Sequence, residues 1–80
     1  MALMDVVNEI LNKENISGMT RLIYYKFVCD LWIELDKYEK ARWESITKGL
    51  ITFYSKAYGL SVDTLQEIAK LVHKQKGSTR

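Results

Sequence analysis

The two side chains best suited to nucleophilic or metal chemistry are Cys29 and His73, each the only residue of its type among the 80 of the chain. A thiolate beside an imidazole can attack an electrophilic carbon, but Cys29 falls in the most apolar stretch, where we expect a buried and unreactive thiol. No second cysteine or histidine is present to complete a zinc site of ordinary spacing. We therefore expect no enzymatic activity, no metal, no cofactor and no small-molecule substrate.

Positive charge gathers in the C-terminal half. Residues 41–80 carry seven basic and three acidic side chains, whereas residues 1–40 carry five and seven. Such a region can hold a phosphate backbone, but lysines in the last turn of a helix also stabilise its macrodipole, so both interpretations stay open. The residues that would contact nucleic acid are Thr64, Gln66, Lys70, Lys74 and Lys76.

Aromatic residues crowd the middle of the chain, with nine rings between residues 24 and 58. Some of these rings must form the core, yet tyrosine and tryptophan are also enriched at protein interfaces, where they bury large areas. The rings that we predict to face a protein partner are Tyr24, Tyr25, Trp32, Trp43, Tyr54 and Tyr58.

One segment resembles the helix-turn-helix family. Its pattern is carried by Ser55, Gly59, Leu60, Leu65 and Ile68, with Tyr54, Tyr58 and Ser61 beside them. In that family, the resemblance implies, a small residue packs where two helices cross, a glycine four positions later makes the turn, and apolar residues follow at fixed offsets. The resemblance implies a DNA-binding protein that uses residues 54–76. Asp63 and Glu67 depart from this expectation, because carboxylates near the start of a recognition helix repel phosphates.

The helix that must position these groups spans residues 20–35 and is apolar around most of its circumference. Lys26, Asp30 and Glu34 recur every four residues, so we expect this one stripe to face water. A helix with so much apolar surface needs partners on at least two sides. We therefore expect it to be the central helix of the fold.

Three further helices are predicted around it. Residues 3–11 repeat apolar side chains at helical spacing, and Asn15 favours a left-handed end to that helix. Asp36 and Glu39 can cap a new helix and break the chain within residues 36–42. The third helix begins at Trp43 and contains Gly49, which would permit close helix packing. Gly59 would end it, and Ser61 or Asp63 would begin the last helix.

The sequence thus predicts an all-α fold, a compact bundle of three or four short helices that dimerisation or a partner would complete. A single helical domain would cover residues 1–76, followed by a disordered tail at residues 77–80. We expect a non-catalytic interaction module, a small accessory subunit of a larger complex that processes nucleic acid or has another role. The lone cysteine indicates a reducing, cytoplasmic setting, and residues 22–35 are too short and too charged to cross a membrane. The alternative is the helix-turn-helix DNA-binding protein.

Overall fold

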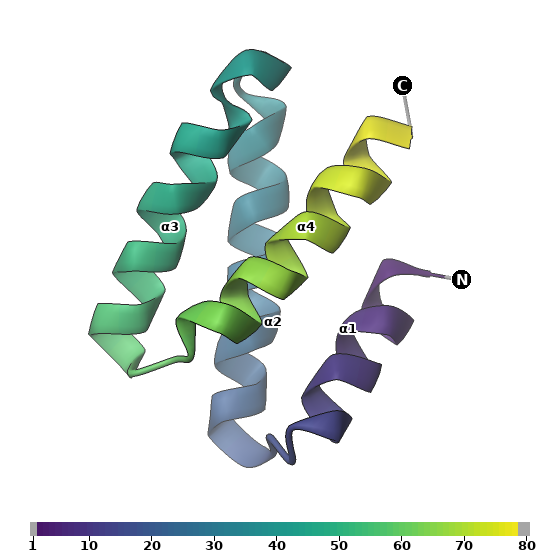
Figure 1. The fold of residues 1–80 in the computed structure, drawn as a ribbon, viewed down its shortest axis with the longest axis vertical. Coiled ribbons are helices and arrows are strands. Elements are labelled where there is room, and N and C mark those ends of the chain that lie inside the picture. Colours follow the sequence, from purple (N-terminus) through teal and green to yellow (C-terminus); the bar gives the residue numbers. More distant parts are fainter. Residues whose placement is uncertain (1, 79–80) are drawn as a thin grey trace.

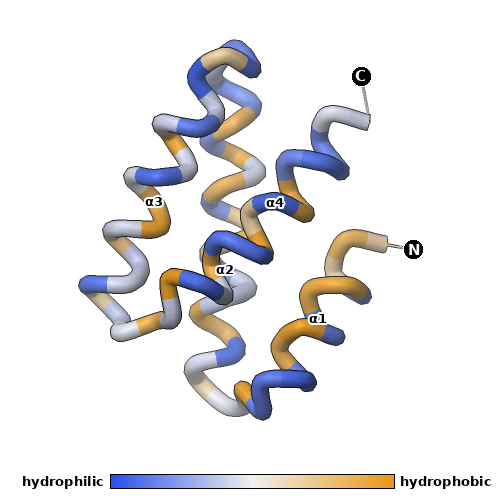
Figure 2. Tube along the Cα trace, in the orientation of Figure 1, coloured by the Kyte–Doolittle hydropathy of each residue, from blue (hydrophilic) through white to orange (hydrophobic). Residues whose placement is uncertain are grey.

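The computed structural model describes residues 2–78 and confirms the predicted all-α class. Four α-helices and one short 3-10 helix make up this part of the chain. They are α1 (Leu3–Lys13), α2 (Gly18–Asp36), η1 (Lys40–Arg42), α3 (Trp43–Tyr58) and α4 (Val62–Ser78). Figure 1 shows α4 crossing in front of α2, with α3 on one side and α1 on the other. Hydrophobic positions recur along every helix, as the colouring in Figure 2 shows.

The helix at the centre of the bundle is α4, not α2. Contacts join α4 to each of the other three helices, whereas α2 packs mainly on α3 and α4. Leu65, Ile68 and Val72 of α4 are completely buried, and their spacing of three and four residues places them on one face. The expectation of a central helix at residues 20–35 is therefore wrong, and α2 keeps one side without an intramolecular partner.

Two turns follow local rules that the sequence contains. Asn15 adopts the predicted left-handed conformation (φ 58°), and the Ile16 amide then donates to the Leu11 carbonyl at 2.9 Å. Gly59 ends α3 with φ 68°, and the Ser61 hydroxyl accepts the amide of Thr64 at 3.3 Å to cap α4. These turns give both helical hairpins their short connections.

The predicted break between residues 36 and 42 is present, but its mechanism differs from the expected cap. Glu39 precedes η1 and makes no side-chain capping bond there, and Asp36 pairs with Lys76 instead. The buried Trp43 indole N–H donates to the Leu35 carbonyl at 3.1 Å and to the Tyr38 carbonyl at 3.2 Å. Trp43 thereby binds the Leu35 carbonyl in the last turn of α2, which also accepts the Tyr38 amide at 3.3 Å, and the Tyr38 carbonyl just beyond the helix.

One smaller expectation also fails, and the last helix overlaps the predicted tail. A Cβ added at Gly49 would meet nothing within 4 Å, so this glycine does not serve close helix packing. Helix α4 continues through Ser78, two residues into the predicted tail at 77–80, and the other two residues of that tail lie outside the described part of the chain.

Candidate functional site

The side of α2 that faces away from the core presents large apolar side chains to solvent. Met19 is 73% exposed, Leu22 56% and Ile33 55%, and Cys29 and Lys26 are also exposed. Because the steps between these five residues alternate between three and four, they form one line along the helix. We call Met19, Leu22, Lys26, Cys29 and Ile33 the α2 seam.

The α2 seam corrects two sequence predictions. Asp30 and Glu34, expected to share the water-facing stripe with Lys26, are only half-exposed at its edge. Cys29, expected to be buried, is exposed. The physical reason is that both sides of α2 are apolar, so its own pattern does not decide which side turns inward.

A polar network lies where the α2 seam meets α3. Lys26 Nζ pairs with Asp30 Oδ2 at 2.9 Å and donates to the Tyr54 hydroxyl at 3.2 Å, and that hydroxyl donates to Asp30 Oδ2. Burial would raise the pKa of Asp30, but the bonds from Tyr54 and Lys26 together lower it below its usual range. Burial and the hydrogen bond to Asp30 raise the pKa of Tyr54 to about 12. The hydrogen bonds from Lys26 to Asp30 and to Tyr54 raise the pKa of Lys26.

Two aromatic rings of α3 extend the exposed apolar surface beyond this network. Phe53 is 56% exposed and Tyr58 43%. The Phe53 ring meets the Tyr54 ring edge-on, with centroids 5.6 Å apart, and the Tyr58 ring lies 5.4 Å from that of Tyr54. Tyr58, predicted to face a protein partner, therefore lies on the surface, and Phe53 is an exposed ring that was not among the predicted interface residues.

Three other predicted interface rings belong to the core. Tyr24, Trp43 and Tyr54 are between 0% and 2% exposed. The Tyr24 hydroxyl accepts the Ser61 amide at 3.2 Å, which holds the turn between α3 and α4 against α2. These residues are unavailable to a partner in this fold, because each ring fills the interior and each polar atom serves an internal bond.

The remaining two rings, Tyr25 and Trp32, are half-buried and engaged within the chain. The Tyr25 hydroxyl accepts Arg21 Nε at 2.7 Å and donates to Asn8 Oδ1, which ties α2 to α1. Lys76 Nζ stands 4.1 Å from the centroid of the Trp32 ring. Their polar and cationic contacts are thus intramolecular.

The residues predicted to contact nucleic acid are split by the structure. Thr64 is buried, and its hydroxyl donates to Glu14 Oε1 at 2.6 Å. Lys76 is also buried, between the Trp32 ring and Asp36. Neither can reach a phosphate in this fold. Gln66, Lys70 and Lys74 remain exposed on α4.

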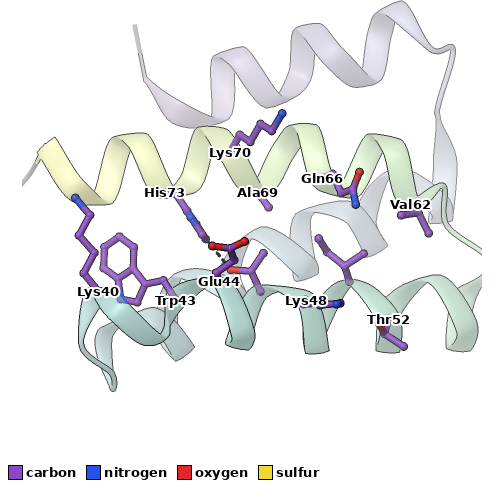
Figure 3. Close-up of a pocket in the computed structure, with 12 residues that line it drawn as sticks. Lys40, Trp43, Glu44, Lys48, Thr52, Val62, Gln66, Ala69, Lys70 and His73 are labelled. Carbon is purple, nitrogen blue, oxygen red and sulfur yellow. Dashed lines mark hydrogen bonds between the residues drawn. The ribbon is translucent and has the colours of Figure 1, made fainter.

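A groove of about 780 Å³ separates α3 from α4 (Figure 3). Trp43, Ile51, Val62 and Ala69 are its apolar lining, and Lys40, Lys48, Lys70 and Glu44 are its charged lining. In the view of Figure 3, Lys70 extends from α4 away from α3. Without Lys70, two lysines and one glutamate line the groove, so its net positive charge is small.

His73 lies in this groove and not beside Cys29. Its Nε2 is 2.6 Å from the Thr47 hydroxyl, and its ring meets the edge of Trp43 at 5.6 Å. Burial lowers the pKa of His73, and the Glu44 carboxylate opposes that effect. Cys29 lies on the exposed side of α2, so the two residues considered for nucleophilic chemistry do not share a site.

Within residues 2–78, no cluster of three or more histidine, cysteine, aspartate or glutamate residues could hold a metal ion. No helix in that range is long and apolar enough to span a bilayer. No protein-family model matches the chain, and no curated protein or solved structure is significantly similar to it. The surfaces of the chain itself are therefore the guide to its function.

Proposed function

We propose that this chain is a non-catalytic protein–protein interaction module, a small accessory subunit that docks through the α2 seam. The observation that carries the proposal is the exposure of Met19, Leu22 and Ile33 on one line of a 19-residue helix. Single exposed apolar residues are ordinary, but three large ones on one side of a helix, here with Lys26 and Cys29 between Leu22 and Ile33, favour an interaction site.

The neighbouring surface has the composition of an interface. Phe53 and Tyr58 add exposed aromatic area on α3, and aromatic residues and methionine are enriched where proteins meet. Lys26 and Asp30 supply a charged pair at the edge of the apolar line, which suits the polar rim that surrounds most interface cores.

The helix-turn-helix alternative has less support. Burial removes Thr64 and Lys76 from the set that would contact DNA. Asp63 and Glu67 lie on α4 with the remaining candidates, and their carboxylates repel phosphates. The short turn at Gly59 fits the family pattern but also fits many helical hairpins.

Site-specific photo-cross-linking in the cell that produces this chain tests the proposal. A photoreactive phenylalanine analogue in place of Ile33 should give a discrete cross-linked product, and Leu22→Asp in the same chain should abolish it. The matched control carries the analogue in place of Glu67, an exposed residue of α4, and should give no such product. Equal labelling from both positions, or no product from Ile33, would contradict a docking role for the α2 seam.

A further inference from the structure

The α2 seam has the spacing of a coiled-coil seam. Residues 19, 22, 26, 29 and 33 follow steps of three, four, three and four, the a and d positions of a heptad repeat. The opposite side of α2 is already occupied, because Phe27, Leu31 and Leu35 are completely buried in the core. A helix with this second seam can pack against one more helix without rearranging the bundle.

We propose that the partner of the α2 seam is a second copy of this chain, with the two α2 helices antiparallel about a twofold axis between residues 27 and 28. This inference rests on the proposed function and names its partner. Helix α2 covers residues 18–36, so its midpoint is residue 27. An axis beside that midpoint lets the whole length of each helix pair with the other.

This register brings two of the three large apolar side chains of the seam together, Leu22 and Ile33, whereas Met19 falls opposite the exposed Asp36 of the other copy at the helix end. Residues whose numbers add up to 55 face each other across such an axis, so Leu22 of one copy meets Ile33 of the other, and the reverse pair forms at the other end. Cys29 then faces the aliphatic stem of Lys26, which can cover apolar surface while its ammonium stays hydrated. The contact is isologous and closes after two copies, as a twofold dimer requires.

Charge also favours the antiparallel arrangement. Lys26 would lie beside Asp30 of the other copy while keeping its own Asp30 at 2.9 Å, so two lysines and two aspartates would alternate around the axis. A parallel pair in register would place Lys26 against Lys26 at the centre of the seam, and like charges in contact destabilise an interface. The charges of Lys26 and Asp30 therefore complement those of the second copy only when the two α2 helices are antiparallel.

The oligomeric state is the first test. Light scattering should give twice the mass of one chain at high micromolar concentration, and Leu22→Asp with Ile33→Asp should give a monomer with unchanged helix content. Val62→Asp is the matched control, because Val62 is 44% exposed but lies in the groove between α3 and α4. It should leave the dimer intact.

Disulfide trapping tests the register. In a Cys29→Ser background, Leu22→Cys with Ile33→Cys should form a covalent dimer under mild oxidation. Neither single cysteine variant should do so, since identical positions would be separated by about 16 Å along the axis at 1.5 Å per residue. Cross-linking of a single variant would indicate parallel helices and overturn the proposal.

The two proposals fail in different ways. A wild-type chain that stays monomeric at all concentrations, while Ile33 still cross-links to a different protein, overturns the dimer but supports the docking role of the seam. A monomer from which Ile33 cross-links to nothing overturns both.

Discussion

Replacing Trp32 by alanine should cost roughly 3 to 4 kcal/mol of unfolding free energy. Truncating a fully buried aromatic ring typically costs about 3 to 5 kcal/mol. Because Trp32 is only half-buried against the core, we expect the lost packing of its ring to cost roughly 2 kcal/mol. The Trp32 ring also holds the buried Lys76 ammonium, 4.1 Å from its centroid, and a desolvated cation–π contact contributes about 2 kcal/mol. In a domain of this size, the melting temperature should fall by more than about 10 °C.

Urea denaturation followed by circular dichroism measures this change, and a double-mutant cycle isolates the Lys76 contribution. Lys76→Met keeps the aliphatic volume and leaves Asp36 in solvent, where its carboxylate is 62% exposed. The cycle of Trp32→Leu with Lys76→Met should show a coupling of about 1 to 2 kcal/mol. A coupling near zero, or a loss below about 0.5 kcal/mol for Trp32→Ala, would refute a packed cation–π contact.

Three further outcomes are expected. Burial lowers the pKa of His73 below its ordinary 6.5 in the folded chain. As the pH falls, the unfolded chain therefore takes up a proton at His73 before the folded chain does, and this stabilises the unfolded state. The melting temperature should fall as the pH drops from 7 to 5, and His73→Gln should remove most of that fall. Gly49→Ala should add up to about 1 kcal/mol of stability, because the site is open and helical, whereas Gly59→Ala should cost about 1 kcal/mol at its positive φ; thermal melts compare the two. Lys70→Ala with Lys74→Ala should leave any weak duplex binding equally salt-dependent, whereas a true DNA-binding protein would lose close to one unit of slope per lysine.

Local signals in the sequence were enough to predict the helices and their turns. Asn15 and Gly59 were predicted to end helices because few residues tolerate a positive φ, and both have it. The break near residue 36 was also predicted, but its cause was not. The bonds from the Trp43 indole to the end of α2 depend on tertiary structure, and a local reading of Asp36 and Glu39 cannot anticipate them.

The candidate site was harder to predict because burial depends on how each helix is rotated in the bundle. Tyr24 and Tyr25 are neighbours of the same type, yet one ring is buried in the core and the other is half-exposed. Lys76 was assigned to a basic surface, since a sequence does not show that its stem crosses an aromatic ring to reach a carboxylate. The heptad spacing of the α2 seam was present in the sequence, but the apolar residues on the other side of α2 obscured it.

The polar network at Tyr54 connects the core of this protein to its proposed docking surface. The Tyr54 ring is completely buried and meets Phe27 edge-on at 5.3 Å, so core packing fixes the position of its hydroxyl. That hydroxyl binds Asp30, which in turn holds Lys26 on the α2 seam. A surface lysine ordinarily samples many rotamers, and ordering it during association costs free energy. Because Asp30 and Tyr54 already bind Lys26 in the folded chain, part of the free energy needed to order the Lys26 side chain is lost during folding and not during association. The charges at the centre of the seam are therefore preorganised for a partner.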